Sequence, residues 1–149
     1  MTFAHELQHF VQHRSAPQLY AANSLVQYFA RDSQFKSVIM ALASRSCDIP
    51  YEREARIVSK RTAENLFGAE VVAQYIKDKI AEPVTAEDAA DWEYIRGLVT
   101  STPYDLACET KLFFRPLKEY RPQIEVVLQG LQNDDPTKDV DWDDLFSGA

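Results

Sequence analysis

The chain has 149 residues, of which 46% are hydrophobic and 26% charged, a composition typical of one globular domain with an apolar core. The formal net charge is −7, but residues 134–149 carry six Asp and one Lys, a net of −5, which leaves −2 for the rest. A nearly neutral body offers no basic stripe, so we expect no nucleic-acid partner. No run approaches the ~20 apolar residues of a membrane helix, so we expect no membrane association either.

Helical patterns recur along the chain, and strand patterns are almost absent. The first six predicted helices, in chain order, cover residues 2–14, 17–29, 35–44, 50–68, 69–81 and 85–99. A seventh begins at residues 101–103 and is interrupted at 115–116, and the last covers 122–131. Asn133 is followed by acidic, turn-like sequence. We therefore predict a mainly α-helical single domain over residues 1–133 and an acidic flexible tail over 134–149.

The first predicted helix carries His5-Glu6-Leu7-Gln8-His9. Residues i and i+4 share one face of a helix, so His5 and His9 can both reach one zinc ion. Zinc lowers the pKa of a bound water, and Glu6 is then the candidate general base. On the opposite face lie Phe3, Leu7 and Phe10, which we expect to anchor this helix in the core. The alternative is a pair of solvated histidines.

His13 continues the same series of histidines but is a poor third ligand. Positions 5 and 13 lie ~12 Å apart along a straight helix, too far to share one ion. We therefore interpret His13 as an exposed histidine or as a residue that supports the ligands. A third ligand must come from elsewhere in the chain.

Two segments together carry a family resemblance. Residues 4–12 (AHELQHFVQ), followed by residues 50–55 (PYEREA), resemble the gluzincin metallopeptidases and, more loosely, small bacterial ImmA/IrrE-like peptidases. The resemblance implies the helical part of a zincin fold, with the usual upstream β-sheet missing or minimal here. It also implies Zn²⁺ bound by His5, His9 and Glu52, with Glu6 catalytic, and a peptide or protein substrate. The family often has Asp or Asn where this chain has Arg56.

Glu54 competes with Glu52 for the third ligand position. Residues i and i+2 point about 200° apart on a helix, so the two glutamates cannot both face one ion. Glu52 shares its flank with the small residues Ala55 and Ser59, which permit another helix to approach closely, and we prefer it for that reason. For either glutamate the alternative is a solvated side chain with a basic partner at i+4.

The remaining features concern location and partners. Cys47 and Cys108 have no metal-type or redox-type spacing, and the N-terminus lacks the basic and apolar regions of a signal peptide, so we expect a cytoplasmic protein. Residues 141–146 mix acids with large apolar side chains. Three interpretations stay open for them: a solubilising tail, a segment that binds a protein partner, or a segment that folds over the zinc site. The alternative to a zinc metallopeptidase is a non-catalytic helical interaction or regulatory protein derived from one.

Overall fold

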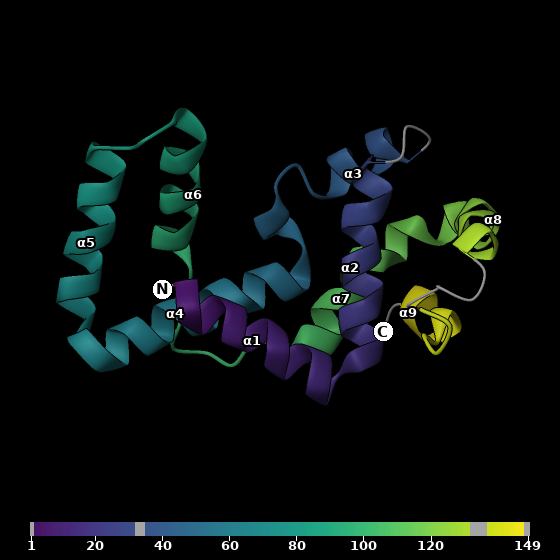
Figure 1. Cartoon of the computed structure of the whole chain (residues 1–149), viewed down its shortest axis with the longest axis horizontal. Helices are drawn as coiled ribbons and strands as arrows, with labels where there is room; N and C mark the ends of the chain where they lie inside the picture. Colours follow the sequence, from purple (N-terminus) through teal and green to yellow (C-terminus); the bar gives the residue numbers. More distant parts are fainter. Residues whose placement is uncertain (1, 32–34, 132–136, 148–149) are drawn as a thin grey trace. The chain divides into compact units, whose positions relative to one another are not determined.

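A computed structural model describes residues 2–31, 35–131 and 137–147. These residues are largely helical and contain no strand, which confirms the predicted mainly α-helical fold class. In the same ranges, no helix combines the length and the apolar composition that a membrane crossing requires. The helices in chain order (Figure 1) are α1 (Thr2–Ser15), α2 (Pro17–Arg31), α3 (Lys36–Leu42), η1 (Ser46–Asp48), α4 (Pro50–Phe67), α5 (Ala69–Ala81), α6 (Ala86–Gly97), α7 (Leu106–Phe114), η2 (Arg115–Tyr120), α8 (Arg121–Leu131) and α9 (Trp142–Ser147).

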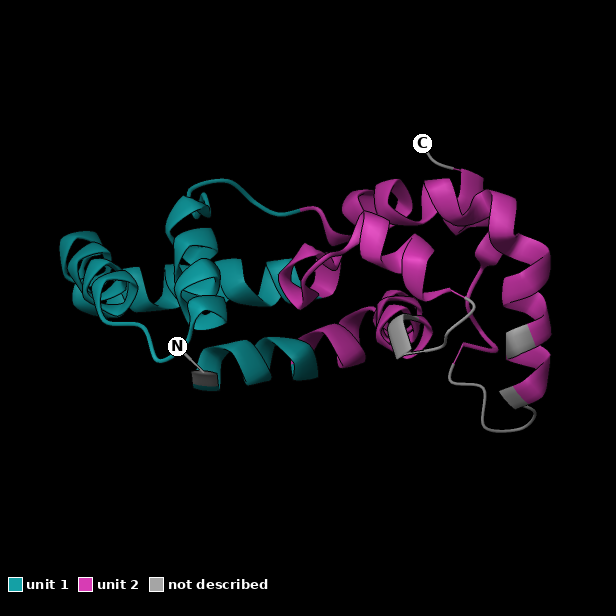
Figure 2. Cartoon of the chain, turned by 90° about the horizontal axis from the view of Figure 1, so that it is seen from above, with its two compact units in different colours: residues 1–10, 52–104 teal, residues 11–51, 105–149 magenta. Residues whose placement is uncertain are grey.

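The chain divides into two compact units, coloured separately in Figure 2. Unit 1 comprises residues 1–10 and 52–104, and unit 2 comprises residues 11–51 and 105–149. Helices α1 and α4 each contribute residues to both units. The boundary at residue 133, drawn from composition, stays a prediction.

Local sequence signals explain most helix ends. Gly68 has φ +89, a left-handed conformation that favours glycine, and it separates α4 from α5. The Thr85 hydroxyl accepts a hydrogen bond from the Asp88 amide at 3.0 Å, which caps α6 as predicted. The prediction that residues 101–103 open the next helix is wrong. The cap is Asp105, whose carboxylate accepts from the Cys108 amide at 3.0 Å, so α7 begins at Leu106.

Unit 2 holds the larger apolar core. Its aromatic rings contact one another in two groups: Phe29 lies 5.2 Å from Phe35, and Phe114 lies 5.9 Å from Trp142, measured between ring centroids. Aliphatic side chains from several helices are buried as well. The fully or nearly fully buried ones are Leu25, Val26, Ile39, Leu117, Ile124 and Leu145.

The acidic segment 134–149 takes part in this core where it is described. Residues 142–147 form α9, whose Leu145 and Phe146 are buried and whose Trp142 ring stacks on Phe146 at 5.7 Å. On its other side, Asp144 accepts a hydrogen bond from Lys111 at 2.7 Å. This packing differs from the expected flexible tail because the apolar residues between the acids form one helical face. Residues 134–136 and 148–149 lie outside the described residues.

Unit 1 is built around the antiparallel pair of α5 and α6, which lie side by side in Figure 1. Val72 and Ile76 of α5 are buried, and the ring of Tyr75 contacts Trp92 of α6 edge to face at 5.7 Å. The Trp92 indole N–H donates to Asp88 at 3.0 Å. Apolar contacts thus join α5 to α6.

Polar contacts join α4 to the end of α6. Lys60, only 8% exposed, donates from Nζ to the carbonyls of Arg96 at 3.0 Å and Leu98 at 2.8 Å. Seven residues earlier on α4, Arg53 donates to the Tyr94 hydroxyl at 2.7 Å. Lys60 therefore satisfies carbonyls at the end of α6 that have no intrahelical partner, and Arg53 holds a side chain of the same helix.

The predicted anchoring stripe of α1 is wrong for unit 1. Phe3, Leu7 and Phe10 are 80%, 49% and 61% exposed. Helix α1 contacts α4 through its opposite, polar face, which carries the histidines and Gln8. The helical periodicity predicts correctly which residues share a face, but in this helix the polar face and not the apolar face packs on α4.

Candidate metal centre

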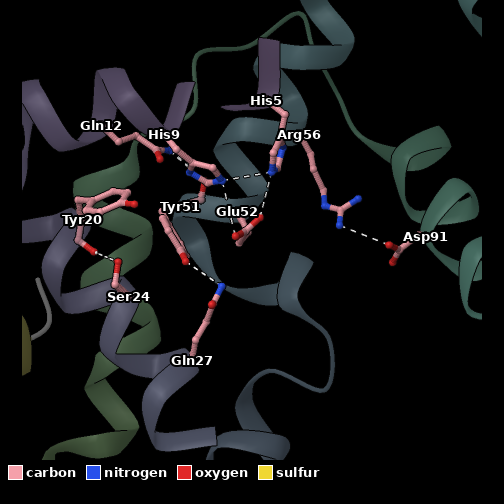
Figure 3. Close-up of polar contacts among 10 residues, drawn as sticks. All are labelled: His5, His9, Gln12, Tyr20, Ser24, Gln27, Tyr51, Glu52, Arg56 and Asp91. Carbon is pink, nitrogen blue, oxygen red and sulfur yellow. Dashed lines mark hydrogen bonds and ion pairs between the residues drawn. The ribbon is translucent and has the colours of Figure 1, made fainter. Parts of the chain in front are cut away.

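The site begins with the two histidines of α1. They are separated by one helical turn, and their rings meet edge to face, with centroids 4.7 Å apart and an interplanar angle of 87°. The Nε2 atoms of His5 and His9 lie 3.1 Å apart. Both nitrogens therefore point to the same place beside the helix, as Figure 3 shows.

Helix α4 supplies the third group. Pro50 occupies the first position of this helix, where its missing N–H costs nothing, and Glu52 lies in the first turn, where the helix dipole favours a negative charge. One carboxylate oxygen lies 3.3 Å from Nε2 of His5, and the other lies 3.6 Å from Nε2 of His9. Glu52 thus faces both imidazoles across the α1–α4 contact within unit 1 (Figure 3).

These distances fit a metal ion. A tetrahedral site with bonds of ~2.0–2.1 Å places neighbouring ligand atoms about 3.3 Å apart. The two Nε2 atoms lie 3.1 Å apart, and they lie 3.3 and 3.6 Å from the two different oxygens of Glu52. All three distances are close to the spacing of zinc ligands. Among the described residues, His5, His9 and Glu52 are the group of three whose ligand atoms all lie within 4.8 Å of one another.

The electrostatics of Glu52 favour its ionised form. Burial alone raises the pKa of this carboxyl, but hydrogen bonds from His5 and His9 and their positive charges when protonated outweigh it, lowering the pKa from 4.5 to about 2. A carboxylate that stays ionised through the whole physiological range is what a metal ligand needs. An ionised carboxylate beside two imidazoles favours positive charge at this site.

Glu54, the competing glutamate, has a different position. Its carboxylate accepts a hydrogen bond from Gln8 Nε2 at 3.2 Å, so it faces α1 one residue before His9. It does not belong to the group of three. The structure therefore brings Glu52 rather than Glu54 to the histidines, and the Gln8–Glu54 bond helps to set the register of α1 on α4. Sequence reasoning missed this bond because Gln8 occupies a variable position of the motif.

Glu6 and His13 lie outside the group of three. Glu6 follows His5 on α1 and is exposed. His13 is also exposed, and its ring contacts Tyr20 edge to face at 5.4 Å within unit 2. The structure thus places His13 away from the ligand positions, as the helix rise predicts.

Arg56 occupies the next turn of α4 after Glu52. Its guanidinium extends toward Asp91 of α6, and the Nη2 to Oδ2 distance is 3.4 Å (Figure 3). The sequence marked Arg56 only as a departure from the family pattern. Its partner Asp91 could not be found from periodicity, since the two residues are 35 positions apart.

Comparisons with known proteins add no relative. No family model matches the chain, and no curated protein or solved structure is significantly similar to it. The chemistry of the site therefore has to be argued from the side chains themselves.

Proposed function

We infer that His5, His9 and Glu52 bind a zinc ion and that the chain is a zinc-dependent hydrolase of peptide bonds. The observation that carries this inference is the convergence of two imidazole nitrogens and one carboxylate within 4.8 Å. Imidazole and carboxylate are common zinc ligands, and two histidines with one glutamate is a ligand set of catalytic sites. The peptide-bond specificity rests on the resemblance of the motif to gluzincins.

The number of protein ligands separates catalysis from a purely structural role. Structural zinc sites usually have four protein ligands, whereas three protein ligands leave a position for water and substrate. The side chains of His5, His9 and Glu52 are 20%, 15% and 13% exposed, so solvent reaches the site. When bound there, zinc lowers the pKa of a water molecule and polarises a substrate carbonyl.

Glu6 is the residue of this chain that would accept the proton from the attacking water. It follows His5 directly on α1, and its exposed side chain is not fixed by packing. A carboxylate in this role acts as general base and then returns the proton to the leaving amine. Its contribution is separable from metal binding, because Glu6 is not one of the three converging groups.

Metal analysis of the purified protein tests the site. We expect one zinc per chain, and a zinc affinity more than about 100-fold lower in His5→Ala and in Glu52→Gln, because each change removes a ligand. Glu54→Gln and His13→Ala are matched controls that should retain zinc. Wild-type protein that binds no zinc, or a Glu52→Gln variant that binds it as tightly as wild type, would overturn the proposal.

Catalysis is tested by hydrolysis of casein or a generic peptide by the zinc-loaded protein. Glu6→Gln should retain zinc and lose at least about 100-fold in rate, the size of a general-base contribution. Glu70→Gln, an exposed glutamate of α5, is the control and should leave the rate unchanged.

One observation favours a second candidate, a non-catalytic zinc-binding interaction protein. The exposed Phe3, Leu7 and Phe10 form an apolar face on the helix that carries the histidines. Under this candidate, wild type and Glu6→Gln both bind zinc and both show only background hydrolysis. Equal background rates in the two proteins decide for the second candidate.

A further inference from the structure

Arg56 lies at the edge of the metal centre. It stands four residues after Glu52, so the two side chains leave the same face of α4 one turn apart. In Figure 3 Arg56 leaves the helix on the side of His5, and its guanidinium points away from Glu52. The side chain is only 17% exposed, so most of its length is covered.

The guanidinium of Arg56 has N–H groups without a hydrogen-bond acceptor among the described residues. Of its five N–H groups, Nη2 points to Asp91 at 3.4 Å, which is longer than the 2.7–3.2 Å of an ordinary N–H···O bond. Its Nε is buried and has no hydrogen-bond partner in the described part of the chain. The protein therefore compensates this guanidinium only through the long contact with Asp91, and a ligand oxygen that accepts from its terminal N–H groups is stabilised.

The charges around the site also favour an anion. A divalent metal with two neutral histidines and one glutamate carries a net charge of +1, and Arg56 adds a second positive charge on the same face of α4. Asp91 offsets this only partly, since its side chain is 37% exposed and its contact with Arg56 is long. Two cationic groups with incomplete compensation attract a negatively charged ligand.

We propose that Arg56 binds an oxyanion, a carboxylate or a phosphate, on the ligand held by the metal centre, and that this group defines the substrate class. The proposal rests on metal binding by His5, His9 and Glu52. Arginine suits this role because its planar N–H groups match carboxylate and phosphate oxygens in pairs. Asp91 competes for the same guanidinium and therefore weakens binding of the anion.

The test compares two small ligands that differ only in charge. N-acetylglycine and N-acetylglycinamide are titrated into the cobalt-loaded full-length chain, and the visible absorption of cobalt reports binding. We expect the acid to bind at least about tenfold tighter than the amide, and Arg56→Met to abolish most of that preference. Asp91→Asn should strengthen acid binding severalfold, since it removes the competing carboxylate.

Metal affinity is measured in the same proteins. Arg56→Met should bind cobalt at least as tightly as wild type, because a nearby positive charge has been removed. Arg56→Lys keeps the charge without the planar donors and should show an intermediate preference for the acid, so a folding defect of Arg56→Met does not end the test. Circular dichroism identifies any such defect.

The outcomes separate the two proposals. Wild-type protein that takes up neither cobalt nor zinc overturns the metal centre and the anion site together. Cobalt uptake with equal affinity for acid and amide, an unchanged preference in both Arg56 variants, or weaker acid binding in Asp91→Asn overturns the anion site alone. Inorganic phosphate is the third probe: tighter Arg56-dependent binding of phosphate than of N-acetylglycine assigns a phosphate ligand, and the reverse assigns a carboxylate.

Discussion

The two units of this chain differ in the kind of contact that stabilises the inside of each. Unit 2 buries many large apolar side chains, including the aromatic residues Phe29 and Phe114, whereas the buried apolar residues described in unit 1 are all aliphatic, such as Ile57 and Ile76. Unit 1 buries fewer apolar side chains, and directed polar contacts, among them those of the buried Lys60, join its helices. A unit with a small apolar core has a smaller free energy of unfolding. The stabilisation that a bound ligand adds is therefore a larger share of its total stability.

The largest expected effect tests the apolar side of this comparison. Phe114 is completely buried, and Phe114→Ala should destabilise unit 2 by about 3–5 kcal/mol through the lost burial and the cavity left behind. Hydrogen exchange read by mass spectrometry should show faster exchange concentrated in residues 105–131. Leu112→Ala in the same helix is the control, since Leu112 is 46% exposed and its truncation should cost far less. Equal effects of the two changes would contradict the assigned core.

Zinc should stabilise unit 1 selectively. At a free concentration 100 times its dissociation constant, a bound ion adds about 2.7 kcal/mol to the stability of the unit that binds it. Hydrogen exchange should therefore slow mainly in residues 2–10 and 52–104. The same experiment on His5→Ala should show no protection by zinc. Uniform protection of both units would mean that they unfold as one.

Lys60 tests the polar side of the comparison. Lys60→Met keeps the length and apolar stem of the side chain but leaves the carbonyls of Arg96 and Leu98 without their donor. We expect a loss of about 1–3 kcal/mol, measured by urea unfolding. Lys77→Met, an exposed position of α5, should change stability by less than about 0.5 kcal/mol. A Lys60→Met variant that is more stable than wild type would contradict this prediction. It would show that burying the Lys60 charge costs more free energy than its hydrogen bonds contribute.

The pH dependence of zinc binding gives the smallest effect. Histidine ligands must be neutral, so zinc affinity should fall by at least about tenfold, or 1.4 kcal/mol, between pH 7 and pH 5. Glu52 does not contribute to this loss, because its pKa is lowered to about 2. In the metal-free protein, the stability from Glu52 is present above its ordinary value of 4.5 and is lost only as the pH falls toward about 2. Calorimetric titration with zinc at several pH values measures the affinity.

Local periodicity accounts for what the sequence predicted well. The helix pattern is confirmed, and the i, i+4 spacing of His5 and His9 fixed their common face because it depends only on helical geometry. The approach of Glu52, 43 residues after His9, was expected from the family resemblance and from the small residues beside it. Its zinc-ligand role stays a prediction.

Long-range packing limited the remaining predictions. Charged residues such as Lys60 look like a solvated face in sequence, yet Lys60 is buried, since the carbonyls that accept from it lie about 36 residues later. The apolar face of α1 looks like a core face for the same reason, although Phe3 is 80% exposed. In both cases the periodicity predicts which residues share a helix face. It does not predict which other segment of the chain packs against that face.

The placement of the two tryptophans allows the folding of each unit to be followed separately. Trp92 lies in unit 1 against Tyr75, and Trp142 lies in unit 2 against Phe114 and Phe146. Replacing either one by phenylalanine leaves a single indole whose fluorescence reports on one unit. Stopped-flow mixing of such variants with and without zinc would show which unit folds first, and whether the metal accelerates folding or only slows unfolding.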